Sequence, residues 1–413
     1  MENLYSTIDV LASANTDDVD VMQEALTAIR NHLGMEVAYI SEFVEGRAHF
    51  RRVDAPGLEH LIKVGDSQSL DDVYCNHILA GRLPQLIPDT SKEPLAESLP
   101  ITRAVPIGSH VSIPIHLANG APYGMFCCLS PRAIPTLNER DLETMRVFGG
   151  IAAKQVNKEI EELRATRSSR AGTESVLLEK DYQVVFQPIV NLLTMEMSAV
   201  EALTRFGPQP YRSPDKWFQD AFDSGLGIEL ELAVIRSAVE AFSLLPNDVD
   251  MSVNASPQTI VSGRLAEVLD GKQLHRTILE LTEHAHVADY ALLHSALAPL
   301  RKAGVKIAID DAGAGYSGLQ HIVQIAPDII KLDMSLIRSI DAHQARRALT
   351  TAMIYFARET GASVVAEGIE TSAELKVLQT LGVNKGQGYL LGKPGPLPAY
   401  VSPVEFADEL MSA

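Results

Sequence analysis

The sequence predicts an α/β protein in which a modified (β/α)8 barrel follows a smaller α+β domain. Its 413 residues leave room for a second domain beside such a barrel, which takes about 250 residues. From about residue 180 onward, short apolar runs alternate with helical stretches, a pattern typical of parallel strands joined by crossover helices. Before that point, strand-like runs follow one another with short connections, as in a small α+β domain.

The first domain is predicted to occupy residues 1–165. A helical spacing of apolar residues over 15–34 comes first, and a long helix that begins at a capping box of Thr136 and Glu139 closes the domain. Between these helices, four runs are predicted to be strands: 35–44, 47–53, 110–117 and 122–130. A short ANGA turn joins the last two, which indicates a hairpin.

The long helix leaves two interpretations open. Leu142, Gly149, Val156 and Leu163 are spaced seven residues apart, which indicates a short coiled-coil seam. Packing of the helix against its own domain would explain the same apolar positions. Residues 168–174, SSRAGTE, have the composition of a linker, so we expect the helix to end before them.

The second domain is predicted to span residues 175–405. Eight apolar runs in it are strand candidates: 184–190, 195–203, 248–256, 277–283, 305–311, 328–334, 363–370 and 385–392. Only NLLT separates the first run from the second, whereas parallel neighbours need a dozen or more connecting residues. The first strand is therefore predicted to run antiparallel to the second.

The bulk composition argues against several functional classes. The net charge of -18 argues against a surface that coats nucleic acid and against binding to an anionic membrane. Cys75, Cys127 and Cys128 form neither a disulfide framework nor a zinc motif, which indicates a reducing, cytoplasmic location. The first twenty residues lack the features of a signal peptide, and no apolar run approaches the ~20 residues of a membrane helix.

A polar residue lies at or near the end of each apolar run of the predicted barrel. Since the carboxyl ends of parallel barrel strands share one mouth, these residues should converge although they are far apart in sequence. Two of them are adjacent aspartates, whose charges repel each other unless cations lie between them. The set consists of Gln187, Glu201, Asn254, Glu280, Asp310, Asp311, Lys331, Glu367 and Gln387.

The donor types of this set point to hard cations. Carboxylate and amide oxygens without cysteine favour Mg²⁺ or Mn²⁺, and two ions roughly 3.5–4 Å apart would form a clamp for attack at phosphorus. Lys331 is then either a barrel lysine paired to an acid or the group that holds the attacking water. Arg205 is either a phosphate ligand or half of a surface ion pair. Taken singly, an acid at a strand end is more often a solvated loop residue or a helix cap.

Seven motifs, in this order, resemble those of the EAL-domain cyclic di-GMP phosphodiesterases. The motifs are EALTR (201–205), VNAS (253–256), ELTE (280–283), DDAGAGYSGL (310–319), KLD (331–333), AEGIE (366–370) and QGYLLGKP (387–394). The resemblance implies a modified barrel whose first strand is antiparallel. It also implies hydrolysis of one phosphodiester of cyclic di-GMP with two Mg²⁺ or Mn²⁺ ions, which gives linear pGpG.

The same resemblance implies roles for individual residues. Lys331 would position the nucleophilic water and act in catalysis with Glu201 and Glu367, and Glu283 would brace the loop after Asp311. The implied metal ligands are Glu201, Asn254, Glu280, Asp310, Asp311 and Glu367. The dinucleotide site would be lined by Gln187, Leu203, Arg205, Asp333 and Gln387.

One loop departs from the family pattern. Ala312, Ala314 and Gly318 stand where the family commonly has Phe, Thr and Ser. No implied ligand is lost, but this loop couples metal binding to dimerisation in the family, so the rate or the regulation of the reaction should differ. A barrel that captures cyclic di-GMP without cutting it is therefore one alternative. A metal-dependent phosphodiesterase for another substrate is the second.

The first 165 residues resemble a GAF domain. The basis is a leading helix, a sheet, a closing helix and the stretch YCNHILAGRLPQLIPD (74–89). Such domains often bind small ligands or dimerise, and they pass a signal through their last helix. We therefore expect a cytoplasmic homodimer in which the helix over 137–166 regulates the barrel.

Two histidine-containing pairs permit a ligand interpretation. Cys75 lies near His77, which is compatible with a tetrapyrrole or haem, but a half-buried thiol and a loop histidine are the favoured interpretation. His284 and His286 resemble a metal pair beside Glu283, yet a role in the loop or at the start of a helix is favoured because the carboxylate site is already full.

Overall fold

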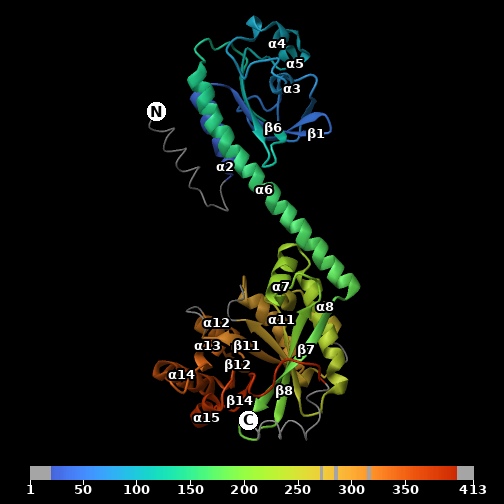
Figure 1. The fold of residues 1–413 in the computed structure, drawn as a ribbon, viewed down its shortest axis with the longest axis vertical. Coiled ribbons are helices and arrows are strands. Elements are labelled where there is room, and N and C mark those ends of the chain that lie inside the picture. The colour runs from blue at the N-terminus through green and yellow to red at the C-terminus, as the bar shows by residue number, and fades with distance from the viewer. Residues whose placement is uncertain (1–19, 270–272, 283–286, 314–317, 398–413) are drawn as a thin grey trace. The chain divides into compact units, whose positions relative to one another are not determined.

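The computed structural model describes residues 20–269, 273–282, 287–313 and 318–397 (Figure 1). The chain divides into two compact units, Met1–Ala165 and Thr166–Ala413. Among the described helices, none combines the length and the apolar character that crossing a bilayer requires.

The first unit is an α+β domain built on an antiparallel sheet. The strands lie in the order β3-β2-β1-β6-β5-β4, and the predicted hairpin joins β5 to β6. The strands β3 and β4 are too short to produce a sequence pattern, and the sequence did not indicate them. The bounds are β1 (Val37–Val44), β2 (Arg47–Asp54), β3 (Ser67–Ser69), β4 (Leu86–Ile87), β5 (Ser109–His116) and β6 (Pro122–Ser130).

Helices cover both faces of this sheet. On one face, α2 (Val21–Leu33) and α6 (Glu139–Glu179) pack their apolar side chains on the strands. On the other face, α3 (Tyr74–Leu79) packs Tyr74, Cys75 and Ile78 into a second core. This packing corrects the expectation for Cys75, which is buried at 2% exposure, and for His77, which lies on α3 rather than in a loop. The remaining short helices are α4 (Pro94–Ser98), α5 (Pro100–Ala104) and the 3₁₀ turn Thr90–Lys92.

The start of α6 differs from the expected capping box. The Asn138 side chain accepts a hydrogen bond from Arg140 N at 3.0 Å, and Asp141 accepts one from Asn138 N at 2.9 Å. Asn138 therefore caps the helix in place of Thr136, in keeping with the strong preference for asparagine at this position.

The body of α6 packs on the domain that precedes it. Leu142, Gly149 and Val156 are buried in the first unit, whereas Leu163 is 58% exposed. Packing on the first unit therefore explains the first three positions of the heptad spacing, and Leu163 takes no part in it.

The end of α6 corrects the expectation of a linker. The helix continues through residues 168–174 to Glu179. Thr173 and Val176, three residues apart on one side of the helix, are buried, and Val176 packs with Phe206 and Trp217 of the second unit's own core. This apolar contact stabilises a helical conformation that the polar composition of the segment does not indicate.

The second unit is a closed barrel, in the order β10-β11-β12-β13-β14-β7-β8-β9. β7 is antiparallel to both of its neighbours, and the other pairs are parallel, so the predicted fold class and the predicted direction of the first strand are confirmed. The bounds are β7 (Tyr182–Asn191), β8 (Met197–Phe206), β9 (Asp250–Asn254), β10 (Thr277–Thr282), β11 (Lys306–Ala312), β12 (Ile329–Leu332), β13 (Ser363–Ala366) and β14 (Lys385–Gly386).

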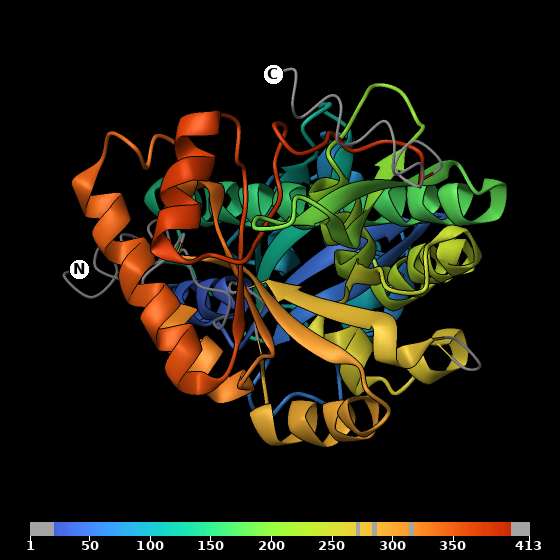
Figure 2. The ribbon, with the colours of Figure 1, turned by 90° about the horizontal axis from the view of Figure 1, so that it is seen from below.

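Helices surround these strands, as the view from below shows (Figure 2). They bury the outer faces of the strands, which explains why the strand sequences read as nearly continuous apolar runs. Their bounds are α7 (Pro214–Asp223), α8 (Gly227–Glu240), α9 (Pro257–Val261), α10 (Leu265–Leu269), α11 (Tyr290–Lys302), α12 (Gly318–Ile325), α13 (Met334–Ile337), α14 (Gln344–Thr360) and α15 (Ser372–Leu381).

Candidate functional site

The barrel interior contains an apolar layer with a polar layer directly above it. The apolar layer consists of Ile189, Ala199, Ile278, Ala308, Ile329 and Val365. Because side chains alternate along a strand, the residue two positions further points to the same interior. On β8, β10, β11, β12 and β13, the polar residue comes two positions after the apolar one in the sequence. On β7, which runs in the opposite direction, the polar residue comes two positions before it. The polar layer is therefore Gln187, Glu201, Glu280, Asp310, Lys331 and Glu367.

Lys331 lies at the centre of this layer and is 1% exposed. Its Nζ is 2.8 Å from both Glu280 Oε2 and Glu367 Oε1, 3.0 Å from Asp310 Oδ1 and 3.3 Å from Glu201 Oε2. Burial alone would lower the pKa of Lys331, but the surrounding carboxylates raise it well above its ordinary value. The ammonium therefore stays charged.

The carboxylates differ in the direction of their pKa shifts. Burial raises the pKa of Glu367 to about 8, although Lys331 opposes this shift. Burial and the charge of Glu201 also raise the pKa of Glu280 well above its ordinary value. For Glu201, burial acts in the same direction, but Lys331 and a hydrogen bond from Gln387 outweigh it and lower the pKa. One ammonium thus leaves the acids only partly ionised.

Two overlapping groups of acids have the proximity that a metal ion needs. Glu201, Glu280 and Asp310 form one group, and Asp310, Asp311 and Glu367 form the other; within each group, one oxygen from every member lies within 4.8 Å of the others. Asp310 belongs to both, which places two candidate cation positions side by side. Asp310 Oδ1 is buried, and the ammonium of Lys331 is its ion-pair partner at 3.0 Å, so a cation in either group would lie next to this ammonium.

An irregularity in β11 brings both aspartates into these groups. Neighbouring side chains of a regular strand point to opposite faces, so Asp310 and Asp311 could not normally share a site. The register of β11 against β12 shifts between Ile309 and Ala312, and Asp311 has a φ of 57°. A left-handed backbone at a non-glycine residue costs about 1–3 kcal/mol, and such strain concentrates at functional sites.

Three amides fix the orientation of Glu201. Gln387 Nε2 donates to Glu201 Oε2 at 2.6 Å, and Asn254 Nδ2 donates to Oε1 at 3.4 Å. Gln387 Nε2 also donates to Gln187 Oε1 at 3.0 Å, and Gln187 Nε2 donates to the Gly392 carbonyl. The structure thus places Gln187 and Gln387 in the barrel wall beside Glu201, and their contact with a dinucleotide stays a prediction.

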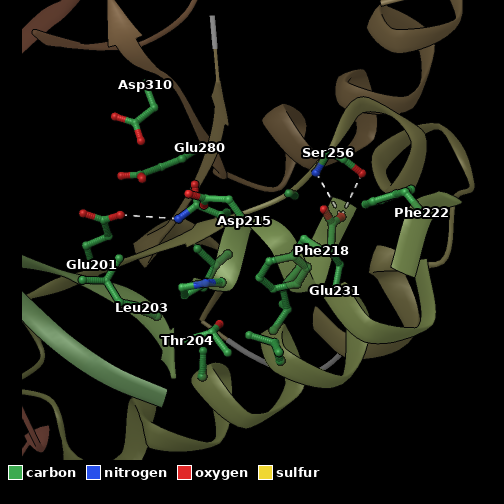
Figure 3. Close-up of a pocket in the computed structure, with 18 of the residues that line it drawn as sticks. Glu201, Leu203, Thr204, Asp215, Phe218, Phe222, Glu231, Ser256, Glu280 and Asp310 are labelled. Atoms are coloured by element: carbon green, nitrogen blue, oxygen red, sulfur yellow. Dashed lines mark hydrogen bonds between the residues drawn. The ribbon is translucent and has the colours of Figure 1, made fainter. Parts of the chain in front are cut away.

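A cavity of about 780 Å³ opens beside the acidic groups (Figure 3). Glu201, Glu280 and Asp310 lie on one side of it, and Phe218 and Phe222 of α7 lie on the other. The predicted substrate residues Leu203 and Arg205 line the cavity, together with Asn254, Asp311 and the acids Asp215 and Glu231.

Two other predicted residues are not placed at the cavity by the described part of the chain. Asp333 is the N-cap of α13, where it accepts a hydrogen bond from Ser335 N at 2.9 Å. It is not among the described residues that line the cavity, so its substrate role stays a prediction. Glu283 lies outside the described residues, as do His284 and His286.

Two polar contacts of the site were missed by sequence reasoning. Ser252 Oγ donates to Glu280 Oε1 at 2.5 Å, and Ser252 lies two residues before Asn254 on β9, so strand alternation could have revealed it. Glu231 on α8 accepts hydrogen bonds from Ser256 N at 3.0 Å and Oγ at 2.9 Å, and burial raises its pKa. No strand pattern points to Glu231, because a helix supplies it.

Known proteins show similarity to both parts of the chain. The EAL domain family model matches residues 171–394, and the GAF domain model matches residues 19–156. The "Cyclic di-GMP phosphodiesterase PA2567" of Pseudomonas aeruginosa is 32% identical over 234 residues, which cover 54% of this chain and 40% of that protein. The "Probable cyclic di-GMP phosphodiesterase PdeB" of Escherichia coli (strain K12) is 31% identical over 246 residues, which cover 57% and 46%. The chain thus spans less than half of the length of either relative.

Solved structures agree with these matches. "PaMucR Phosphodiesterase, c-di-GMP complex" is 28% identical with a TM-score of 0.51, over 56% of this chain and 99% of that one. "Structure of EAL Enzyme Bd1971 - cAMP and cyclic-di-GMP bound form" is 26% identical with a TM-score of 0.54, over 68% of this chain and 81% of that one. Since the EAL match covers more than half of the 413 residues, this chain belongs to the EAL domain family and carries a GAF domain ahead of its barrel.

Proposed function

We propose that this chain hydrolyses one phosphodiester of cyclic di-GMP to give linear pGpG, with two divalent cations at the barrel mouth. The observation that carries the proposal is the pair of carboxylate groups that share Asp310 beside the buried ammonium of Lys331. The names and ligands of the similar proteins support cyclic di-GMP as the substrate.

The charges at the mouth support two ions rather than one. The four carboxylates around the ammonium of Lys331 are more than one ammonium can offset, and the two overlapping groups of acids offer one position for each of two divalent cations. We assign the ligands to Glu201, Asn254, Glu280, Asp310, Asp311 and Glu367. When bound, Mg²⁺ or Mn²⁺ ions would supply Lewis-acid activation of water and of the phosphoryl group.

The side chains around the acids have complementary roles in this proposal. Lys331 donates a hydrogen bond that holds the attacking water next to the acids, and Gln387 and Asn254 keep Glu201 in position. Arg205, in the cavity wall, offsets charge on a phosphoryl oxygen. Phe218 and Phe222 form an apolar wall on which a base can stack.

A product assay tests the proposal. Full-length protein, cyclic di-GMP and Mg²⁺ or Mn²⁺ should yield pGpG, and EDTA should stop the reaction. Glu201→Ala should abolish turnover because the substitution removes one ligand of the first acidic group. Glu229→Ala is the matched control, since Glu229 forms a half-exposed ion pair with Arg264 on the outside of the barrel. Retained activity in Glu201→Ala would remove Glu201 from the ligand set.

A cyclic di-GMP receptor without hydrolytic activity is the second candidate. The observation behind it is the loop after the two aspartates, where Ala312 is fully buried in β11 in place of the usual phenylalanine. Tight binding of cyclic di-GMP in Mg²⁺ without any pGpG would favour the receptor. Turnover of another nucleotide in a panel of cyclic nucleotides would favour a different substrate.

We further propose that the chain works as a homodimer with the domain boundaries 1–165 and 175–405, and that α6 carries a regulatory signal to the barrel. The continuity of α6 across the boundary of the two units supports the last point. A full-length protein and a truncated protein that begins at residue 166, which keeps Thr173 and Val176, should differ in turnover rate. Equal rates would exclude regulation by the front domain under those conditions.

A further inference from the structure

Two cysteines of the first unit, far apart in sequence, lie next to each other in the fold. Cys75 belongs to α3 and Cys127 belongs to β6, and both thiols face the core between the sheet and α3. The thiols interact with each other and with the hydroxyl of Tyr39. Tyr39 lies directly across from Cys127 in the pairing of β1 with β6.

The third cysteine lies on the opposite face of the same strand. Cys128 follows Cys127, so its side chain points away from α3, and its Sγ is 4.0 Å from Met145 Sδ of α6. All three cysteines are buried free thiols. The chain therefore contains one thiol pair and, one residue away, a thiol that the sheet separates from that pair.

The surroundings give the two paired thiols different reactivities. A hydrogen bond from the Cys127 thiol lowers the pKa of Cys75 despite burial. Burial raises the pKa of Cys127 well above its ordinary value. Because the thiolate is the reactive form, Cys75 is the better nucleophile and Cys127 is the thiol placed to resolve its oxidised form.

We propose that Cys75 and Cys127 form a redox-sensitive pair that small hydroperoxides convert to a disulfide. The Cys75 sulfur attacks the terminal oxygen of the hydroperoxide, the O–O bond breaks, and the leaving alkoxide or hydroxide takes the Cys75 proton. Cys127 then attacks the resulting sulfenic acid and displaces its hydroxyl, which leaves as water with the Cys127 proton. Two thiols and one hydroperoxide thus give one disulfide, one alcohol or water, and one further water. A low-molecular-weight thiol reverses the change.

The short helix α3 provides the access that this reaction needs. It has six residues; the buried Val73 precedes it directly, and exposed residues follow on both sides, Asp71 and Asp72 before Val73 and Ala80 to Arg82 after the helix. Leu79 at its end is 38% exposed. Tyr74 and Ile78 of α3 are buried together with Cys75, so a small oxidant reaches this thiol, 2% exposed, only in the minor population in which the helix opens.

The position of the pair connects it to α6. A disulfide would tie α3 to β6, and the next residue of β6, Cys128, contacts Met145 of α6 on the other face. A shift of β6 therefore reaches the helix that continues into the second unit. This proposal is independent of the proposed phosphodiesterase activity.

Peptide mapping of the full-length wild-type protein tests the pair directly. Reduced protein is treated with hydrogen peroxide, unfolded in an alkylating reagent and digested. We expect one disulfide-linked pair of peptides containing Cys75 and Cys127, at a mass two hydrogen atoms below their sum, with Cys128 alkylated. Dithiothreitol should restore alkylation of all three cysteines.

Single cysteine variants test which thiols form the link. In Cys128→Ser the same link should form at the wild-type rate, whereas Cys75→Ser and Cys127→Ser should each prevent it. The wild-type map keeps the proposal falsifiable even if a variant fails to fold. Alkylation of Cys75 and Cys127 to the same extent with and without peroxide would overturn the proposal, as would a link that involves Cys128.

Discussion

Asp310 is the acid that belongs to both candidate cation groups of the site. It contributes an oxygen to both acidic groups and lies 3.0 Å from the ammonium of Lys331. Its neighbour Asp311 reaches the same region only through a left-handed backbone. A substitution of Asp310 should therefore weaken cation binding at both positions. Glu280 and Glu367 each belong to one group, so a substitution of either should weaken binding at one position only.

Metal stoichiometry provides the first prediction at this scale. We expect calorimetric titration with Mn²⁺ to give two ions per wild-type chain, one tight ion for Glu367→Gln, and no tight ion for Asp310→Asn. Asp215→Asn is the matched control, because Asp215 lines the cavity but belongs to neither acidic group. Two tight ions in Asp310→Asn would contradict a shared ligand.

His110 provides a pH-dependent prediction in the first unit. The side chain is 1% exposed on β5, its ring packs against Tyr74, and its Nδ1 has no hydrogen-bond partner among the described residues. Burial lowers the pKa of His110 from 6.5 to about 4. Between about pH 6.5 and pH 4, the His110 side chain therefore binds a proton in the unfolded chain but not in the folded chain. The contribution of neutral His110 to stability is fully present above about pH 6.5 and is lost as the pH falls towards 4.

Hydrogen exchange can measure this loss. The free energy of opening of the β5 and β6 amides, obtained from exchange rates corrected for the intrinsic rate, should fall between pH 7 and pH 5. The total decrease should reach about 3 kcal/mol near pH 4. His110→Gln should flatten this dependence, while a change of the exposed His116 on the same strand should leave it intact. An identical pH dependence in wild type and His110→Gln would rule out His110 as the source.

Two irregular strands position the site at the scale of elements. β7 runs antiparallel to its neighbours, so Gln187 reaches the polar layer from the opposite chain direction. β11 shifts its register before Ala312 and thereby turns two consecutive aspartates towards the mouth. The long helix α6 is a third departure, since it runs through a segment with the composition of a linker.

The helical end of α6 yields a prediction with a built-in control. Val176 is 1% exposed and packs with Phe206 and Trp217, whereas Leu178, two residues later, is 86% exposed. Val176→Asp should lower the free energy of unfolding of the second unit by about 3 kcal/mol, because it buries an unpaired carboxylate. Leu178→Asp should change it by less than about 0.5 kcal/mol. The fluorescence of the single tryptophan, Trp217, reports this transition in urea. Equal midpoints would indicate that the segment is a linker in solution.

Self-association belongs to the whole molecule. α14 presents exposed side chains along one side, Leu349 at 47% and Tyr355 at 63% exposure, with the exposed alanines 345, 348 and 352 between them. We expect this apolar side of α14 to pack against the same surface of a second copy related by a two-fold axis.

Light scattering after size exclusion tests this surface. Wild-type protein should have twice the chain mass of 44.9 kDa, and Leu349→Arg should return it to 44.9 kDa because a buried guanidinium lacks a partner there. Leu193→Arg changes an equally apolar residue that is 73% exposed elsewhere and should leave the mass doubled. A monomeric wild type at micromolar concentration would remove α14 as an interface.

The sequence allowed most of the barrel and the membership of the acidic site to be predicted. The position of Glu201, Glu280 and Lys331 at or near the ends of apolar runs predicted that they converge, and the short NLLT connection gave the direction of β7. Both signals are local, because they depend on the covalent geometry of a few consecutive residues. The cap of α6 was misassigned because Thr136 and Asn138 are both good capping residues, and only the backbone path selects between them.

Contacts between distant segments could be decided only by the folded chain. The sharing of Asp310, the hydrogen bond from Ser252 to Glu280, the entry of Glu231 into the cavity and the meeting of Cys75 with Cys127 all join different strands and helices. Sequence by itself determined which strands carry a polar residue at their ends, since that follows from the order of residues along the chain. Tertiary structure decided which of them touch, because their separation depends on how the barrel closes and how the sheet packs against its helices.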